Sequence, residues 1–306
     1  MPTIDGHEIT VSNPDKLLFP DDGITKGDLV DYYERVAARM LPQVRDRPLH
    51  MNRFPDGIGR IAIQQKRVPE SFPAWITRAT VDLHKGGIIT HAVIDNAATL
   101  VYLANYNMVT AHVWLSRVQA PERPDHLIFD LDPSDDDFGL VRKTARTLKA
   151  LLEELTLIPF VKTTGSRGLH VVVPITVGPS FEQAHIFADY VAQRLAATDP
   201  HHLTTEFLKQ KRDGRLFIDL NRNSYGQTAV AAYSVRARRT APIAMPITWS
   251  DVDRDTLRPD GVTVRNVWDW LRDGADPWEQ METARRGMPD IQDSDKPNRS
   301  GRRRRG

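Results

Sequence analysis

The sequence contains no cysteine among its 306 residues. Disulfide bonds, zinc–thiolate sites and thiol catalysis are therefore excluded. No run of about 18 apolar residues is present, so no membrane-spanning helix is predicted. The N-terminus, Met1-Pro2-Thr3, lacks the basic and apolar regions of a signal peptide. We therefore expect a cytoplasmic protein with no membrane partner.

A strong net charge is also missing, since the formal charge at pH 7 is only +1. A bound polyanion would need a local basic patch that acidic residues elsewhere offset. The hydrophobic fraction of 40% is sufficient for a sizeable core. We predict one folded domain over residues 1–289. Residues 290–306, which end in four arginines, have the composition of a basic, disordered tail.

The most informative stretch is a short apolar run that ends in two carboxylates, His126-Leu127-Ile128-Phe129-Asp130-Leu131-Asp132-Pro133. Such a run predicts a buried strand, from which Asp130 and Asp132 project on the same face. Two adjacent like charges raise one pKa unless a cation lies between them, and Mg²⁺ commonly binds one or two carboxylates together with substrate phosphates. The alternative is an acidic strand end that caps the next helix, for which Ser134 and Asp135 are also suited.

A second stretch combines glycines, hydroxyls and a cation, Thr163-Thr164-Gly165-Ser166-Arg167-Gly168, between two predicted strands. Backbone N–H groups, hydroxyls and a guanidinium in one tight loop are what a phosphate requires. The loop is not a P-loop, because a strand follows it instead of a helix. His170 comes directly after it and shares a strand face with Val172. It is either a structural histidine or a ligand contact.

A third apolar strand, Leu216-Phe217-Ile218, also ends in a carboxylate, Asp219, and basic clusters lie at residues 209–215 and 233–239. Helices are predicted from Thr25 to Pro42, from an Asp95 cap to near His112, over 138–157 and over 181–197. Lys26 lies at a helix start, where the helix dipole favours an anion over a cation. This mismatch suggests an anionic ligand there, although a solvated lysine is the alternative.

In this order, the motifs Asp-Leu-Asp-Pro, Thr-Thr-Gly-Ser-Arg-Gly-Leu-His and Ile-Asp-Leu-Asn resemble the three motifs of archaeo-eukaryotic primases. The resemblance is strongest to the polymerase domain of bacterial ligase D and its stand-alone relatives, and it extends from Asn13 to about Trp270. It implies an α+β fold in which two β-sheets flanked by helices enclose one catalytic cleft. It also implies template-directed nucleotidyl transfer to a primer 3′-OH.

The resemblance assigns roles to individual residues. The metal-binding and catalytic carboxylates are Asp130, Asp132 and Asp219, which would hold two Mn²⁺ or Mg²⁺ ions. The nucleotide-binding residues are Thr164, Ser166, Arg167, His170, Arg236 and His112, the last at the end of a helix. The pocket for a DNA 5′-phosphate is formed by Asn13, Lys16 and Lys26, and the other DNA contacts are Arg53, Lys66 and Arg212.

The biological role that the resemblance implies is filling of short gaps or broken ends during DNA repair, in either non-homologous end joining or excision-repair gap filling, with a preference for ribonucleotides and for manganese. The expected partners are NTPs or dNTPs, gapped or broken DNA with a downstream 5′-phosphate, a separate ATP-dependent DNA ligase, and Ku. The location would be the nucleoid.

The sequence departs from its relatives at two places. Thr164 and Arg167 occur where relatives often have Ser and Lys, which keeps a hydroxyl and a cation. Ile63 and Gln64 occur where relatives have two phenylalanines that stack on the template.

Two other functions are compatible with parts of the pattern. A haloacid-dehalogenase-type phosphatase also has an apolar strand running into Asp-x-Asp, but it needs Thr or Val where Ser134 occurs and has no use for the glycine loop. A non-catalytic DNA-end-binding module would use Lys16 and Lys26 but would leave the three aspartates unexplained.

Overall fold

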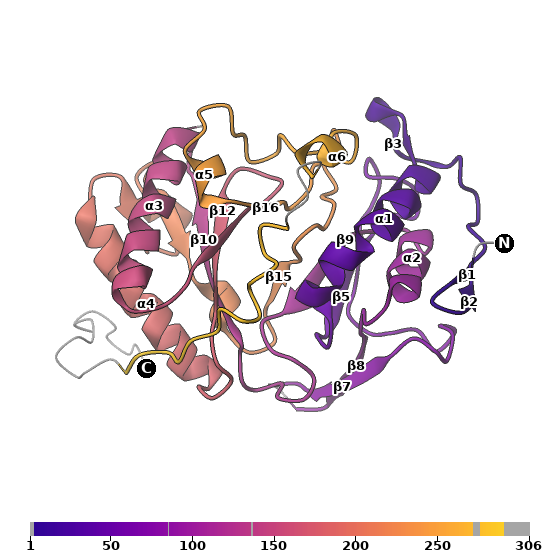
Figure 1. The fold of residues 1–306 in the computed structure, drawn as a ribbon, viewed down its shortest axis with the longest axis horizontal. Coiled ribbons are helices and arrows are strands. Elements are labelled where there is room, and N and C mark those ends of the chain that lie inside the picture. Colours follow the sequence, from indigo (N-terminus) through magenta and orange to yellow (C-terminus); the bar gives the residue numbers. More distant parts are fainter. Residues whose placement is uncertain (1–2, 85, 136, 272–275, 291–306) are drawn as a thin grey trace.

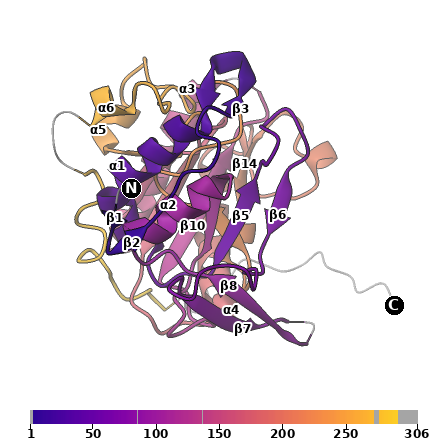
Figure 2. The same cartoon turned by 90° about the vertical axis from the view of Figure 1, so that its right-hand side faces the viewer.

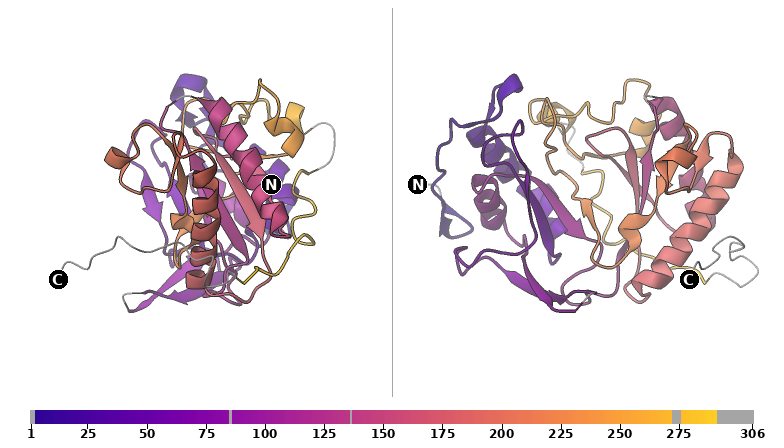
Figure 3. Two further views of the ribbon diagram at one scale, coloured as in Figure 1. Left: turned by 90° about the vertical axis from the view of Figure 1, so that its left-hand side faces the viewer. Right: turned by 180° about the vertical axis from the view of Figure 1, so that it is seen from behind.

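A computed structural model describes residues 3–84, 86–135, 137–271 and 276–290. The fold is of the expected α+β type, with two principal sheets that face each other and helices on their outer sides (Figure 1). The view from behind shows the same two-layered arrangement, with the elements up to β9 in one layer and most of the later elements in the other (Figure 3). The last 16 residues of the predicted tail lie outside the described residues.

The larger sheet has six strands in the order β13-β14-β10-β12-β11-β16. Their bounds are β10 His126–Asp132, β11 Phe160–Thr163, β12 Leu169–Pro174, β13 Leu203–Thr204, β14 Leu216–Asp219 and β16 Pro246–Ile247. All neighbours pair antiparallel except β13 and β14. Helices α3 (Phe138–Glu154) and α4 (Phe181–Thr198) cover its outer face. On α3 the buried residues recur every three or four positions, which gives the helix one apolar side for the sheet.

The smaller sheet has four antiparallel strands in the order β15-β9-β5-β6. Their bounds are β5 Leu49–Arg53, β6 Ile63–Gln65, β9 Met108–Trp114 and β15 Thr228–Val230. Helices α1 (Lys26–Val44) and α2 (Ala97–Asn105) lie on its outer side. Tyr33 of α1 donates a hydrogen bond to the Val109 carbonyl of β9 at 2.7 Å, which fixes the helix to the sheet.

Small elements surround these two layers. They are the hairpins β1 (Thr3–Ile4) with β2 (His7–Glu8), β3 (Leu17–Phe19) with β4 (Ile24–Thr25) and β7 (Arg78–Asp82) with β8 (Ile88–Ala92), the helices α5 (Trp249–Val252) and α6 (Val267–Trp270), and the 3₁₀ turns η1 (Pro20–Asp22), η2 (Lys209–Lys211) and η3 (Asn221–Asn223). Figure 2 shows the β7–β8 hairpin below the smaller sheet.

Three local predictions were wrong. Helix α1 continues past Pro42 to Val44, because a proline in the last turn removes only one hydrogen bond. Asn96, and not Asp95, caps α2, since its side chain accepts the Thr99 N–H. That helix ends at Asn105, and the stretch that reaches His112 is strand β9. The β-branched residues of Val109-Thr110 and Val113 favour a strand there.

The C-terminal segment is held to the larger sheet by a buried ionic cluster around Asp125. Arg47 forms an ion pair with Asp125 at 2.7 Å, and both side chains are 1% exposed. Arg117 and Arg285 contact the same carboxylate at 2.9 and 3.0 Å. Burial alone would raise the pKa of Asp125, but Arg47 outweighs it and holds that pKa well below its usual range. The cluster therefore links the segment after α1, the residue before β10 and the last described segment.

None of the helices formed by the described residues is both long and apolar enough to cross a bilayer.

Candidate active site

Four polar residues form a row across the larger sheet because their strands pair in register. Asp219 of β14 lies opposite Asp130 of β10, Asp130 lies opposite His170 of β12, and His170 lies opposite Lys162 of β11. Directly paired residues in antiparallel strands project from the same face of a sheet. Asp132 follows two positions after Asp130 and therefore lies on that face too, as the sequence predicted.

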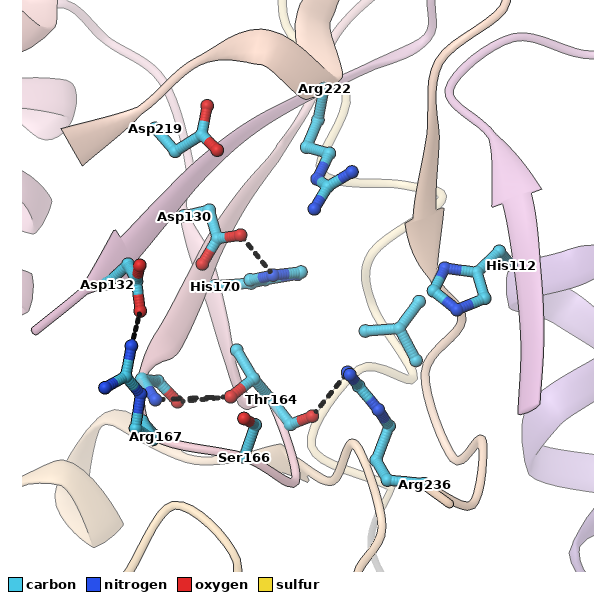
Figure 4. Close-up of a pocket in the computed structure, with 12 residues that line it drawn as sticks. His112, Asp130, Asp132, Thr164, Ser166, Arg167, His170, Asp219, Arg222 and Arg236 are labelled. Atoms are coloured by element: carbon cyan, nitrogen blue, oxygen red, sulfur yellow. Dashed lines mark hydrogen bonds and ion pairs between the residues drawn. The ribbon is translucent and has the colours of Figure 1, made fainter. Parts of the chain in front are cut away.

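Basic side chains of the protein contact two of these carboxylates. His170 Nε2 lies 3.3 Å from Asp130 Oδ2, and Arg167 Nη2 lies 3.2 Å from Asp132 Oδ1 (Figure 4). Arg212 is the next cation, with Nη1 3.9 Å from Asp132 Oδ2. Asp219 instead accepts hydrogen bonds from the backbone N–H and side-chain amide of Asn221, at 2.8 and 2.6 Å.

The two carboxylates of β10 differ in pKa, which is the expected result for two adjacent like charges. Burial, and then the charge of Asp130, raise the pKa of Asp132. Burial would also raise the pKa of Asp130, but His170 beside it outweighs burial and lowers that pKa. His170, together with the charges of Arg222 and Lys162, thus stabilises the deeper carboxylate in its charged form, while the outer one is the more easily protonated.

The loop between β11 and β12 depends on two glycines. Gly165 adopts φ +61°, and a Cβ there would lie 2.7 Å from Cγ of Arg236. A Cβ on Gly168 would lie 2.0 Å from the Leu131 carbonyl oxygen, so the loop packs directly on the end of β10. Only residues without a side chain permit these approaches. The loop is thereby fixed between the carboxylates and Arg236, whose Nη1 donates to the Thr164 carbonyl at 2.9 Å.

All the predicted catalytic and nucleotide-binding residues line one cavity of about 230 Å³ between the two sheets. The larger sheet supplies the carboxylates, His170 and the glycine loop, while the smaller sheet supplies His112 and Val230 (Figure 4). His112 therefore faces the cavity from the middle of β9 and not from a helix end. Burial, and then Arg236, lower the pKa of His112 well below its usual value, so its ring is neutral at pH 7.

The hydroxyls of the loop have different surroundings. Thr164 Oγ1 accepts the Gly168 N–H at 3.2 Å and lies 3.1 Å from the Gly168 carbonyl, so it closes the loop on itself. Ser166 lines the cavity and has no hydrogen-bond partner within the described part of the chain. Of the two, Ser166 is the hydroxyl that is available to a ligand.

The residue types at this site suit a divalent cation. Asp130, Asp132 and Asp219 supply carboxylate oxygens on adjacent strands, and oxygen is the ligand that Mg²⁺ and Mn²⁺ prefer. Over the described ranges, however, no three acidic or histidine side chains are close enough to form a finished metal site. Because Asp130 and Asp132 face His170 and Arg167, an ion would have to compete with these contacts.

The predicted DNA-binding residues lie outside this cavity. Lys16 and Lys26 flank the β3–β4 hairpin and are neighbours, since the Lys26 N–H donates to the Lys16 carbonyl at 2.8 Å. Asn13 begins the turn before it, with φ +49°. The ammonium of Lys26 is buried and donates to Ser12 Oγ at 2.8 Å, and burial, followed by the charge of Lys16, lowers its pKa. Lys16 lies 3.7 Å from Asp56.

The other three have separate positions. Arg53 bonds Gln65 at 2.7 Å and lies over the Tyr106 ring at 3.4 Å, so it ties β5 to β6 and to the end of α2. Lys66 is exposed just after β6. Arg212 lies over the Phe217 ring at 3.7 Å, next to the carboxylates.

Two residues of the site were missed from sequence. Arg222 lines the cavity from η3, three positions after Asp219, and its buried Nε has no partner within the described residues. Lys162 belongs to the cross-sheet row, is 2% exposed, and its ammonium has no hydrogen-bond partner there either. A charged residue within an otherwise apolar strand could have identified Lys162. The position of Arg222 depends on a turn that sequence periodicity does not predict.

Comparison with known proteins gives the same assignment as the motifs. The model of the family described as LigD, primase-polymerase domain, matches residues 25–278. The chain belongs to the LigD primase-polymerase family. Members of this family are nucleotidyltransferases, and the chain is assigned to that class of enzyme.

Individual relatives support this assignment. The chain is 36% identical over 259 residues to the multifunctional non-homologous end joining DNA repair protein LigD of Mycobacterium tuberculosis, which covers 82% of this chain and 34% of that protein. It is 31% identical over 246 residues to LigD of Pseudomonas aeruginosa, which covers 80% of this chain and 29% of that protein. The chain thus spans about a third of the length of these curated relatives.

A solved structure of the polymerase domain of Mycobacterium tuberculosis ligase D in complex with DNA has a similar fold. The TM-score is 0.85 at 32% sequence identity, and the match covers 90% of this chain and 98% of that one. The α+β fold predicted from the motifs is therefore confirmed.

Proposed function

We propose that this LigD-type primase-polymerase adds nucleotides, preferably ribonucleotides, to a primer 3′-OH under the direction of a template. The observation that carries the proposal is the single cavity in which three carboxylates lie beside a cationic glycine loop. Carboxylates alone would suit many metal enzymes, and a cationic loop alone would suit many phosphate sites. Their combination between two sheets suits a reaction that joins a triphosphate to a hydroxyl group.

The side chains divide into two groups in this proposal. Asp130, Asp132 and Asp219 would hold two divalent ions, Mn²⁺ or Mg²⁺. When bound, such ions supply positive charge to the attacking and leaving oxygens. The triphosphate would be held by the second group, which consists of His112, Thr164, Ser166, Arg167, His170, Arg222 and Arg236.

Within the second group, the structure suggests different contributions. Arg167 belongs to the glycine loop and Arg236 donates to the Thr164 carbonyl of that loop, and both provide guanidinium donors for phosphate oxygens. Ser166 provides a free hydroxyl, while Thr164 keeps the loop closed. His112 is neutral and can orient a group by a hydrogen bond without adding charge.

The DNA in this proposal is a short gap or a broken end with a downstream 5′-phosphate, bound by Asn13, Lys16 and Lys26, with Arg53, Lys66 and Arg212 as further contacts. The relatives named above are non-homologous end joining proteins, so gap filling in that repair pathway is the proposed role. A separate ATP-dependent ligase and Ku are the proposed partners, and the cytoplasmic nucleoid is the proposed location.

Primer extension tests the function directly. Purified protein with a gapped template–primer, Mn²⁺ and NTPs should extend the primer by the templated nucleotide, and Mn²⁺ should serve better than Mg²⁺. Asp130→Ala and Asp132→Ala should each abolish extension but leave DNA binding largely intact, because DNA is held mainly through phosphate contacts. Near wild-type extension by either variant would contradict the metal assignment.

The same experiment separates the two alternative functions. A phosphatase would release phosphate from a generic ester such as p-nitrophenyl phosphate, and Asp130→Ala would abolish that release. A non-catalytic end-binding module would bind the gapped DNA without extending it under any metal or nucleotide condition. We expect extension and no ester hydrolysis.

A further inference from the structure

Residues 205–215, which connect β13 to β14, place two large apolar side chains in solvent. Phe207 is 63% exposed and Leu208 is 49% exposed. We call these two residues the apolar tip. The turn η2 follows immediately and projects from the body of the molecule (Figure 2). An exposed phenylalanine beside an exposed leucine is unfavourable in water unless another molecule covers them.

The surroundings of the apolar tip are basic. Lys209 and Lys211 follow it directly, and both are exposed without an ion-pair partner in the described ranges of the chain. An aromatic side chain next to unpaired cations is the arrangement that binds a single nucleic-acid strand, because the ring stacks on a base while the cations contact the backbone. An acidic, apolar protein segment would be the other polyanionic occupant, and the position of the tip favours the nucleic acid.

That position is set by Arg212, which connects the apolar tip to the active site. Its Nη2 donates to the Phe207 carbonyl at 2.9 Å, and its Nε donates to the Glu206 carbonyl at 3.1 Å. The other terminal nitrogen, Nη1, lies 3.9 Å from Asp132 Oδ2. One guanidinium group therefore separates the backbone of Phe207 from a proposed metal-binding carboxylate.

The side of the cavity on which the apolar tip lies identifies the strand. The apolar tip lies between β13 and β14, the strand of Asp219, and Arg212 links it to Asp132. The glycine loop instead joins β11 and β12 on the other side of β10, and of this loop Arg167 reaches back to Asp132. The triphosphate is proposed to occupy the latter side. The group left for the Asp132–Asp219 side is the primer 3′ end.

From this geometry we propose that Phe207, supported by Leu208, stacks on the 3′-terminal base of the primer strand, while Lys209 and Lys211 contact its phosphates. The inference rests on the proposed polymerase function, since it concerns the primer of that reaction. It assigns the apolar tip to one ligand, a single-stranded or frayed primer end, which it recognises by base stacking and not by sequence.

The test compares two primers that differ only at the 3′ terminus, one with a normal base and one with an abasic residue. Binding is measured by fluorescence anisotropy with Asp130→Ala protein, which cannot extend the primer. The protein with an intact tip should bind the normal primer roughly 5- to 100-fold more tightly, the range expected for stacking of one base on an aromatic ring.

Variants of the tip, made in the same Asp130→Ala background, then locate this preference. Phe207→Ala/Leu208→Ala should bind both primers equally, at the level of the abasic one, while Phe207→Trp should restore the preference. Val177→Ala, which truncates another exposed apolar side chain, serves as the matched control and should bind like the unmodified tip. An apolar tip that serves a protein partner would leave DNA binding unchanged in the double variant, and this result would overturn the inference.

The two proposals fail in distinguishable ways. If protein with Asp130 intact extends primers but the normal and abasic primers bind equally, the stacking role is wrong and the polymerase function stands. If the preference for a terminal base is present but no extension occurs under any condition, the polymerase function is wrong and the apolar tip is still a nucleic-acid contact.

Discussion

Arg167 is the residue at which the two halves of the proposed active site meet. It belongs to the glycine loop, lines the cavity, and lies 3.2 Å from Asp132 Oδ1. In the proposed reaction, a metal ion held by Asp132 would neutralise that carboxylate, and the Arg167 guanidinium would then be available to a phosphate oxygen. Without a ligand, the contact with Asp132 holds the guanidinium in place.

Replacing Arg167 with Ala should raise the KM for the nucleotide by roughly ten- to hundred-fold, because a charge-assisted contact to phosphate contributes about 1.5–3 kcal/mol. Binding of template–primer should change much less. Steady-state kinetics with one templated NTP, together with DNA anisotropy, measures both quantities. Arg254→Ala is a suitable control, since Arg254 is 61% exposed and pairs with Asp251 at 3.2 Å. An unchanged KM would show that the loop is only a turn.

Lys162 is destabilising as an isolated charge. Burial, and then the charge of Arg236, lower its pKa from 10.5 to about 7. At a pH between these values, the unfolded chain carries a proton on this side chain that the folded protein lacks. The buried lysine therefore lowers the free energy of unfolding below pH 10.5, and this destabilisation is fully present below about pH 7. Lys162→Met should therefore increase the free energy of unfolding at pH 7, on the order of a few kcal/mol.

The increase from Lys162→Met should decline as the pH rises toward 10. Urea unfolding of both proteins at pH 7, 8.5 and 10 measures it, and Lys143→Met, at a side chain that is 72% exposed, is the control. A variant that is less stable than the wild type at pH 7 would show that a buried anion or water compensates the ammonium.

At the scale of an element, the β3–β4 hairpin brings together residues that are far from the catalytic motifs in sequence. It places Lys16 next to Lys26, whose pKa is lowered by burial and by that neighbouring charge. Two like charges held together are stabilised by a doubly charged anion, and a terminal phosphate carries more charge than an internal diester. The hairpin therefore has the electrostatics of a 5′-phosphate site.

We expect gapped DNA with a downstream 5′-phosphate to be bound and filled better than the same DNA with a 5′-hydroxyl. The difference should weaken with salt, because exposed charges are screened over about 8–10 Å at physiological ionic strength. Lys16→Ala/Lys26→Ala should remove it without preventing extension on an open template–primer. Titrations of both DNAs at low and high salt provide the measurement, and equal affinity at low salt would contradict the site.

The elements themselves show what sequence could predict. The strands that carry Asp130, His170 and Asp219 were predicted because each is a short apolar run next to a polar motif. Their register could not be predicted, since the pairing of Asp219 with Asp130 depends on residues 89 positions apart in the chain. His112 was assigned to a helix end because the turn between α2 and β9 is marked by Asn107 alone, without Gly or Pro.

At the scale of the whole molecule, several of the described histidines are buried or half-buried, and these make folding sensitive to acid. Burial lowers the pKa of His50 and of His170 to about 4. Burial is also the main cause that lowers the pKa of His91, His112 and His126. These residues lie on both sheets and beside the ionic cluster of Asp125, so their protonation would disturb both layers.

The contribution of these histidines to stability should therefore be constant above about pH 6.5 and fall steeply between pH 6.5 and 4. In that window the unfolded chain binds protons that the folded protein excludes, and each such proton changes the free energy of unfolding by at most about 1.4 kcal/mol per pH unit.

His50→Gln should reduce this pH dependence, because it removes one of the side chains whose pKa is lowered on folding. The substitution breaks no hydrogen bond of His50 Nε2, which has no partner within the described residues. His201→Gln, at an exposed position, should leave it unchanged. Urea unfolding midpoints from pH 7.5 to 4.5 give the slope for each protein. If the slope for His50→Gln equals that of the wild type, His50 takes up its proton in the folded protein as readily as in the unfolded chain. Its pKa is then not lowered by burial, because solvent or Asn52 reaches its ring.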